Sequence, residues 1–64
     1  MTVHIGDRVK IKSDFDYYSN GRYAGEMGTV LELSPYGWDL KLKMDSDEEG
    51  YWECFNFDDL EEQK

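Results

Sequence analysis

The chain has 64 residues and a formal net charge of −8 at pH 7, with 39% hydrophobic and 16% aromatic residues. This length predicts one small domain, residues 1–64, whose aromatic content is typical of a folded protein and not of a disordered acidic tail. No apolar run reaches the ~18 residues of a membrane-spanning helix, and the N-terminus lacks a signal-peptide pattern. The single cysteine, Cys54, excludes an internal disulfide, so we expect a cytoplasmic protein that does not bind membranes.

Short alternating runs separated by turn residues predict an all-β fold. In the first run, residues 8–12, Val9 and Ile11 point to one side and three basic residues to the other. Residues 13–27 show no such period and contain an Asn-Gly turn dipeptide, so they form a long first loop.

Three more strands are expected at 29–33, 38–44 and 51–55. A Pro- and Gly-containing turn at 34–37 and a polar loop at 45–50 separate them. The third run alternates most clearly, with an apolar residue at every second position from 38 to 44. The fourth run is apolar on both sides, so its inward face stays open.

The last residues allow two structures. Residues 57–60 predict a tight turn and a short fifth strand, and the alternative is a brief helix over 59–63 capped by Asp58. Five short antiparallel strands with a long first loop favour a small closed barrel, because closure removes the exposed sheet edges.

Two glycine-containing segments carry a family resemblance. Residues 6–11 (GDRVKI) and 25–30 (GEMGTV), with 59–61 as a closing strand, resemble the SH3-like barrel superfamily, in particular KOW-type modules and related small barrels of bacteria and phages. The resemblance covers nearly the whole chain. It implies a domain that binds peptides, proteins or RNA and is not an enzyme. The RNA-binding KOW modules are basic, whereas this chain is acidic, so we expect no direct binding of nucleic acid.

No set of residues suited to catalysis stands out in the sequence. His4 is the one histidine, Cys54 has no neighbouring base to activate it, and the carboxylates are expected in water. We therefore expect no catalytic residue, cofactor or metal. Residues 45–50 match the start of an EF-hand calcium loop, but the twelfth position is Asn56 and the flanks are predicted strands, which argues against a Ca²⁺ site.

The charge is segregated along the chain. Residues 1–44 hold six acids and six bases, whereas residues 45–64 hold nine acids and one lysine and thus the whole −8. Such a region attracts cationic surfaces. The predicted partner-binding residues are Asp45, Asp47, Glu48, Glu49, Glu53, Asp58, Asp59, Glu61 and Glu62. The alternative is that these acids serve only solubility and guard sheet edges.

Two functions follow from these observations as hypotheses. The first is a non-enzymatic inhibitor or regulator whose carboxylates occupy the basic, nucleic-acid-binding surface of a partner protein in place of phosphates. In size and charge the chain resembles acidic proteins of phages and mobile elements that block restriction or CRISPR enzymes. The second is an SH3-like adaptor or accessory subunit that holds a protein or peptide through loop aromatics. These are Phe15, Tyr17, Tyr18 and Tyr36.

Overall fold

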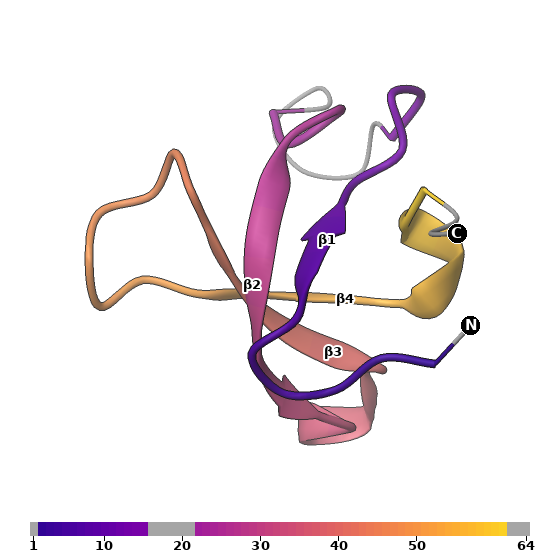
Figure 1. Cartoon of the computed structure of the whole chain (residues 1–64), viewed down its shortest axis with the longest axis vertical. Coiled ribbons are helices and arrows are strands. Elements are labelled where there is room, and N and C mark those ends of the chain that lie inside the picture. Colours follow the sequence, from indigo (N-terminus) through magenta and orange to yellow (C-terminus); the bar gives the residue numbers. More distant parts are fainter. Residues whose placement is uncertain (1, 16–21, 62–64) are drawn as a thin grey trace.

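An antiparallel sheet in the order β1-β2-β3-β4 forms the centre of the computed structural model, which describes residues 2–15 and 22–61 (Figure 1). The elements, in chain order, are β1 (Arg8–Lys10), β2 (Met27–Leu33), the 3-10 turn η1 (Pro35–Gly37), β3 (Leu40–Met44), β4 (Glu53–Phe55) and the 3-10 turn η2 (Phe57–Asp59). These parts of the chain contain no α-helix, so the all-β prediction is confirmed. Among the same residues, no helix is long and apolar enough to cross a membrane.

The alternating pattern of β3 is confirmed in its burial. Leu40, Leu42 and Met44 are buried, and the lysines between them are partly exposed. The strand begins two residues later than predicted because Trp38 still belongs to the preceding turn, where its N–H donates to the Pro35 carbonyl at 2.8 Å.

A β-bulge interrupts the pairing of β2 with β3. Val30 lies opposite Leu42, but the next pair is Glu32 with Lys41, so Leu31 is an extra residue on β2. Its side chain is 42% exposed. The bulge therefore leaves a large apolar side chain of the longest strand uncovered.

One cluster of buried residues makes the core: Val9, Ile11, Phe15, Tyr23, Val30, Leu40, Leu42, Met44, Phe55 and Leu60. The sequence left open which face of the fourth strand points inward. The structure shows that it is the face of Phe55, which is fully buried opposite Leu40. Two aromatics outside the strands pack on the Phe55 ring, Phe15 at 5.5 Å and Tyr23 at 5.8 Å between centroids. The long first loop thus contributes directly to the core.

The C-terminal segment returns to the first strand. Ile11 and Leu60 form an isolated antiparallel bridge, and beside it the Glu61 N–H donates to the Lys10 carbonyl at 2.8 Å. The described residues hold four strands, and the predicted fifth strand is reduced to this bridge. The alternative, a helix over 59–63 capped by Asp58, is wrong in its described part, because the 3-10 turn ends at Asp59 and Asp58 lies inside it. The residue that precedes this turn is Asn56, whose N–H donates to the Asp59 carboxylate at 2.9 Å.

β2 and β3 approach each other closely at Gly28, which lies opposite Met44. A substitution at this position tests the pairing. A Cβ atom added here would lie 2.7 Å from Met44 Sδ and 3.1 Å from the Lys43 carbonyl oxygen. Because Met44 is fully buried, its sulfur has little room to move. We expect Gly28→Ala to lower the free energy of unfolding by about 1–3 kcal/mol, measured by urea denaturation.

Ser46→Ala, in an exposed turn, is the control and should leave stability within about 0.5 kcal/mol. In a double-mutant cycle, Met44→Val should offset part of the Gly28→Ala cost, because it removes the sulfur. A Gly28→Ala protein as stable as the wild type would contradict this strand pairing.

Candidate functional site

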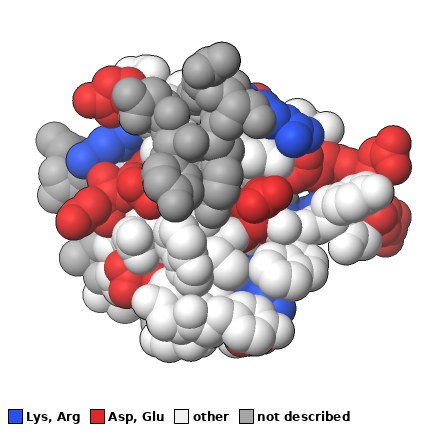
Figure 2. Space-filling model, turned by 180° about the vertical axis from the view of Figure 1, so that it is seen from behind, with Lys and Arg blue, Asp and Glu red and all other residues white. Residues whose placement is uncertain are grey.

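The acids predicted to form one binding surface fall into two groups in space. The loop 45–52, which joins β3 to β4, projects from one side of the molecule, whereas η2 and residues 60–61 lie on the opposite side (Figure 1). Figure 2 shows acidic side chains on both flanks of the rear face, with basic ones among them. The charge segregation in the sequence therefore does not produce one contiguous acidic face. Glu62 lies outside the described residues.

Asp45 pairs with the first strand. Both of its carboxylate oxygens accept hydrogen bonds from the Arg8 guanidinium, with 2.7 Å between Nη1 and Oδ1. These hydrogen bonds hold the pKa of Asp45 below its ordinary value and raise that of Arg8. Asp45 is thus neutralised by a residue 37 positions earlier in the chain.

The side chain of Asp47 is mostly buried, although the residue as a whole is half-buried, and it fixes the loop. Its side chain is 6% exposed and accepts hydrogen bonds from Arg22 Nη2 at 2.7 Å and from the Tyr23 hydroxyl at 2.8 Å. Burial and, to a smaller extent, the hydrogen bond to Asp47 raise the pKa of Tyr23 to about 12. Lys43 Nζ also donates to the backbone carbonyls of Met44 and Asp47, at 2.9 and 2.7 Å. The loop is therefore held to the sheet at several points.

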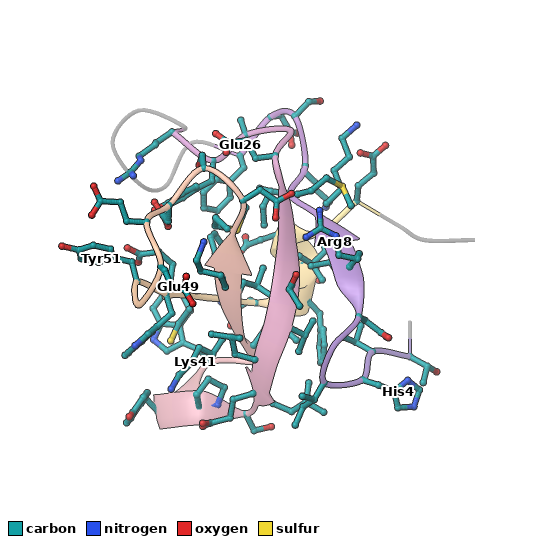
Figure 3. All side chains as sticks on the ribbon, turned by 60° about the vertical axis from the view of Figure 1, so that its left-hand side comes forward. His4, Arg8, Glu26, Lys41, Glu49 and Tyr51 are labelled. Atoms are coloured by element: carbon teal, nitrogen blue, oxygen red, sulfur yellow. The ribbon has the colours of Figure 1, made fainter. Side chains whose placement is uncertain are left out.

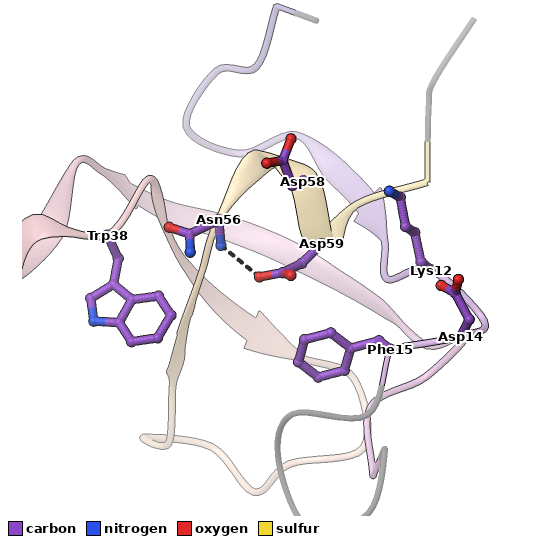
Figure 4. Close-up of a pocket in the computed structure, with 7 residues that line it drawn as sticks. All are labelled: Lys12, Asp14, Phe15, Trp38, Asn56, Asp58 and Asp59. Atoms are coloured by element: carbon purple, nitrogen blue, oxygen red, sulfur yellow. Dashed lines mark hydrogen bonds between the residues drawn. The ribbon is translucent and has the colours of Figure 1, made fainter.

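The acids on the opposite side have partners or line a depression. Glu61 pairs with Lys10 at 3.4 Å, and Asp59 accepts the Asn56 N–H. A depression of about 510 Å³ is lined by Lys12, Asp14, Phe15, Trp38, Asn56, Asp58 and Asp59 (Figure 4). It brings acids from both ends of the chain against two aromatic rings.

The loop keeps two glutamates at its surface. Within residues 2–15 and 22–61, the side chains of Glu48 and Glu49 have no ion-pair or hydrogen-bond partner, and both residues are exposed. Tyr51 and Trp52 follow them and are 62% and 43% exposed. Figure 3 shows Glu49 and Tyr51 on the same flank of the molecule, away from His4. We call residues 48–52 the acidic tip.

Two of the four residues of the predicted aromatic site lie in the described part of the chain, and these two are apart. Phe15 is buried against Phe55, and Tyr17 and Tyr18 lie outside the described residues. Tyr36 is 76% exposed and lies in η1. The first loop precedes β2 and η1 follows it, so the two are at opposite ends of this strand. Phe15 and Tyr36 therefore do not share a surface.

A different aromatic pair exists, which the sequence analysis missed. The Tyr36 ring stacks on Trp52 with 6.1 Å between centroids and 15° between planes. Lys41 Nζ lies 4.3 Å from the Trp52 centroid and 5.4 Å from that of Tyr36, and it is 3.5 Å from Glu32. The alternation of side chains along the fourth strand could have indicated this pair. Phe55 points inward and Trp52 is three positions before it, so Trp52 lies on the outer side.

The turn that presents Tyr36 has an unusual backbone. Ser34 and Tyr36 have φ values of 54° and 51°, in the left-handed region that residues with a Cβ rarely adopt. The conformation of this turn is therefore costly, although the ring it carries is exposed.

The remaining candidates are the calcium-like loop and the thiol of Cys54. Asp45 and Asp47, the first two acids of the calcium-like spacing, are bound by different arginines. In the described part of the chain, no three His, Cys, Asp or Glu side chains are gathered so that they could hold a metal ion. Burial raises the pKa of the Cys54 thiol, which keeps it protonated at neutral pH.

Comparison with protein-family models, curated proteins and solved structures finds no match to this chain. The basis for a function is therefore the arrangement of its own side chains.

The link between Tyr23 and Asp47 has a pH signature. Tyr23→Phe removes the hydroxyl donor to a buried carboxylate, which we expect to cost about 1–3 kcal/mol at neutral pH. The folded-state pKa of Tyr23 is about 12 and the unfolded value is about 10, so its contribution is complete below pH 10 and is lost as the pH rises toward 12. Urea denaturation should show that the difference in the free energy of unfolding between the wild type and Tyr23→Phe becomes smaller between pH 10 and pH 12.

Tyr51→Phe makes the same chemical change at an exposed ring and is the matched control. It should leave stability near that of the wild type at pH 7. A gap between Tyr23→Phe and the wild type that stays constant from pH 9 to pH 12 would show that the hydroxyl does not support Asp47.

Proposed function

We propose that this chain is a non-enzymatic domain that binds a basic protein surface through its acidic tip. The observation that carries the proposal is the exposure of two carboxylates, Glu48 and Glu49, that have no partner among the described residues and lie beside two exposed aromatics on the same loop. Carboxylates attract lysine and arginine, and Tyr and Trp supply contact area that is common at the centres of protein interfaces.

The anchoring of the loop supports binding. Asp45 and Asp47 hold the loop to Arg8, Arg22 and Tyr23. A surface that is already ordered loses less conformational entropy when a partner binds. These two acids are therefore assigned to the shape of the surface, and direct contact is assigned to the glutamates.

Local and overall charge favour the same kind of partner. Residues 45–53 carry five carboxylates. Arg8 and Arg22 pair with two of them and Lys43 donates to backbone carbonyls beside them, which leaves this segment with two negative charges. The net charge of −8 repels nucleic acid over a longer range. A protein surface that normally binds phosphates has the required positive charge, so we propose an inhibitor or regulator of a nucleic-acid-binding protein, acting in the cytoplasm.

The proposed fold family is the SH3-like barrels. The bridge between Ile11 and Leu60 supports this proposal, because it links the end of β1 to the segment that follows β4. That link is what closure of a small barrel requires.

Charge reversal at the tip tests the function. Glu48→Lys/Glu49→Lys should abolish capture of the basic partner from a lysate of the source cell, whereas the unmodified domain should retain it at 50 mM NaCl and release it at 300 mM. With the captured partner purified, the variant should slow association by about tenfold or more, because attraction between opposite charges speeds encounter. DNA or RNA should compete with the native domain.

Asp14→Lys/Asp58→Lys is the matched control, because it makes the same change in net charge at exposed acids that line the depression. It should bind nearly as well as the wild type. If the two double variants lose partner binding to the same degree, binding depends only on net charge. If the tip variant binds as well as the wild type, the acidic tip is not the binding surface.

A second candidate function is the SH3-like adaptor, and the depression between Phe15 and Trp38 favours it. Aromatic walls with acids at the rim suit an extended peptide that carries basic residues. In that case Trp38→Ala should abolish binding of the peptide, and Glu48→Lys/Glu49→Lys should have no effect. The same capture experiment distinguishes the two functions.

A further inference from the structure

A groove lies beside the acidic tip, on the outer side of the sheet. It has a volume of about 500 Å³ and is lined by Leu31, Lys43, Asp47, Glu49, Gly50, Tyr51 and Trp52. Leu31 of β2 and Trp52 before β4 supply apolar walls, and Tyr51 adds a third. All three side chains are exposed although they are large and hydrophobic.

The polar groups of the groove differ in how they are used. Lys43 Nζ donates to two backbone carbonyls, and the Asp47 side chain is buried against Arg22 and Tyr23. The Glu49 carboxylate has no partner in the described parts of the chain. The groove therefore combines apolar walls with one available negative charge.

The molecule already holds a cation against one of these walls. Lys41 Nζ lies 4.3 Å from the centroid of the Trp52 ring. A cation at this distance is attracted by the negative face of the ring, and a guanidinium also stacks on it because it is planar. An arginine fits both features of the groove, since its methylene stem is apolar and its head is a fixed cation.

We propose that this groove receives an arginine side chain of the partner, with its stem against Leu31 and Trp52 and its guanidinium at Glu49. This inference rests on the function proposed above and identifies the residue type that is recognised. A second copy of this chain is the less favourable occupant, because two molecules of charge −8 repel each other.

A peptide titration tests the proposal without the natural partner. The ¹⁵N-labelled full chain is titrated with hexa-arginine and, separately, with hexa-lysine at 50 mM NaCl, and amide and Trp52 indole shifts are followed. We expect the shifts to concentrate at Leu31 and residues 49–52, and hexa-arginine to bind several-fold more tightly than hexa-lysine.

Two pairs of variants separate the groove from general charge. Glu49→Gln should weaken hexa-arginine binding about three- to tenfold, and Glu26→Gln, the same change outside both the groove and the acidic tip, by less than about twofold. Leu31→Thr should weaken binding to a similar degree, whereas Leu33→Thr on the same strand should not. Thermal melting of each variant checks that it is folded.

Each outcome decides between the two claims. Equal effects within each pair, with shifts spread over all acidic residues, would overturn the groove and leave the acidic surface in place. Equal affinity for the two peptides would overturn the choice of arginine. Shifts at Asp14, Trp38 and Asp58 would overturn the groove and favour the adaptor. No binding of either peptide at millimolar concentration would overturn the groove, whereas the proposed function is decided by the capture experiment.

Discussion

The buried carboxylate of Asp47 is the contact on which the shape of the acidic tip depends. A charged side chain that is 6% exposed needs strong partners, and it has them in Arg22 and the Tyr23 hydroxyl. Tyr23 is itself packed on Phe55 in the core. Of the contacts that hold the loop, this carboxylate is the one that connects it to the core, and the glutamates follow it directly in the chain.

This contact also changes how the acids of the C-terminal third should be interpreted. Asp45, Asp47 and Glu61 each pair with a base from the first 22 residues, namely Arg8, Arg22 and Lys10. In the sequence the acids and bases of these pairs are far apart and are counted in different segments of the chain. In the fold they are in contact. A segregated composition is thus compatible with a surface on which much of the charge is locally balanced.

Local pattern predicted those parts of the fold that local physics determines. The alternation of β3 and the turn after β2 followed from side-chain period and from Pro and Gly preferences. The bulge at Leu31 and the reduced fifth strand did not, since both depend on register between distant segments. For the same reason the sequence indicated Glu48 and Glu49 correctly as exposed acids but did not indicate the stack of Tyr36 on Trp52, which joins a turn to a strand end.

The backbone of the Ser34–Gly37 turn has a consequence for how this domain can change. Each non-glycine residue at positive φ costs about 1–2 kcal/mol, which is a large share of the stability of so short a chain. Selection for robustness alone would replace Tyr36 with glycine or asparagine, and the ring stacked on Trp52 would then be lost. Thermostability and the integrity of the outer aromatic pair therefore oppose each other at this position, and engineered stabilisation there would remove the ring that stacks on Trp52.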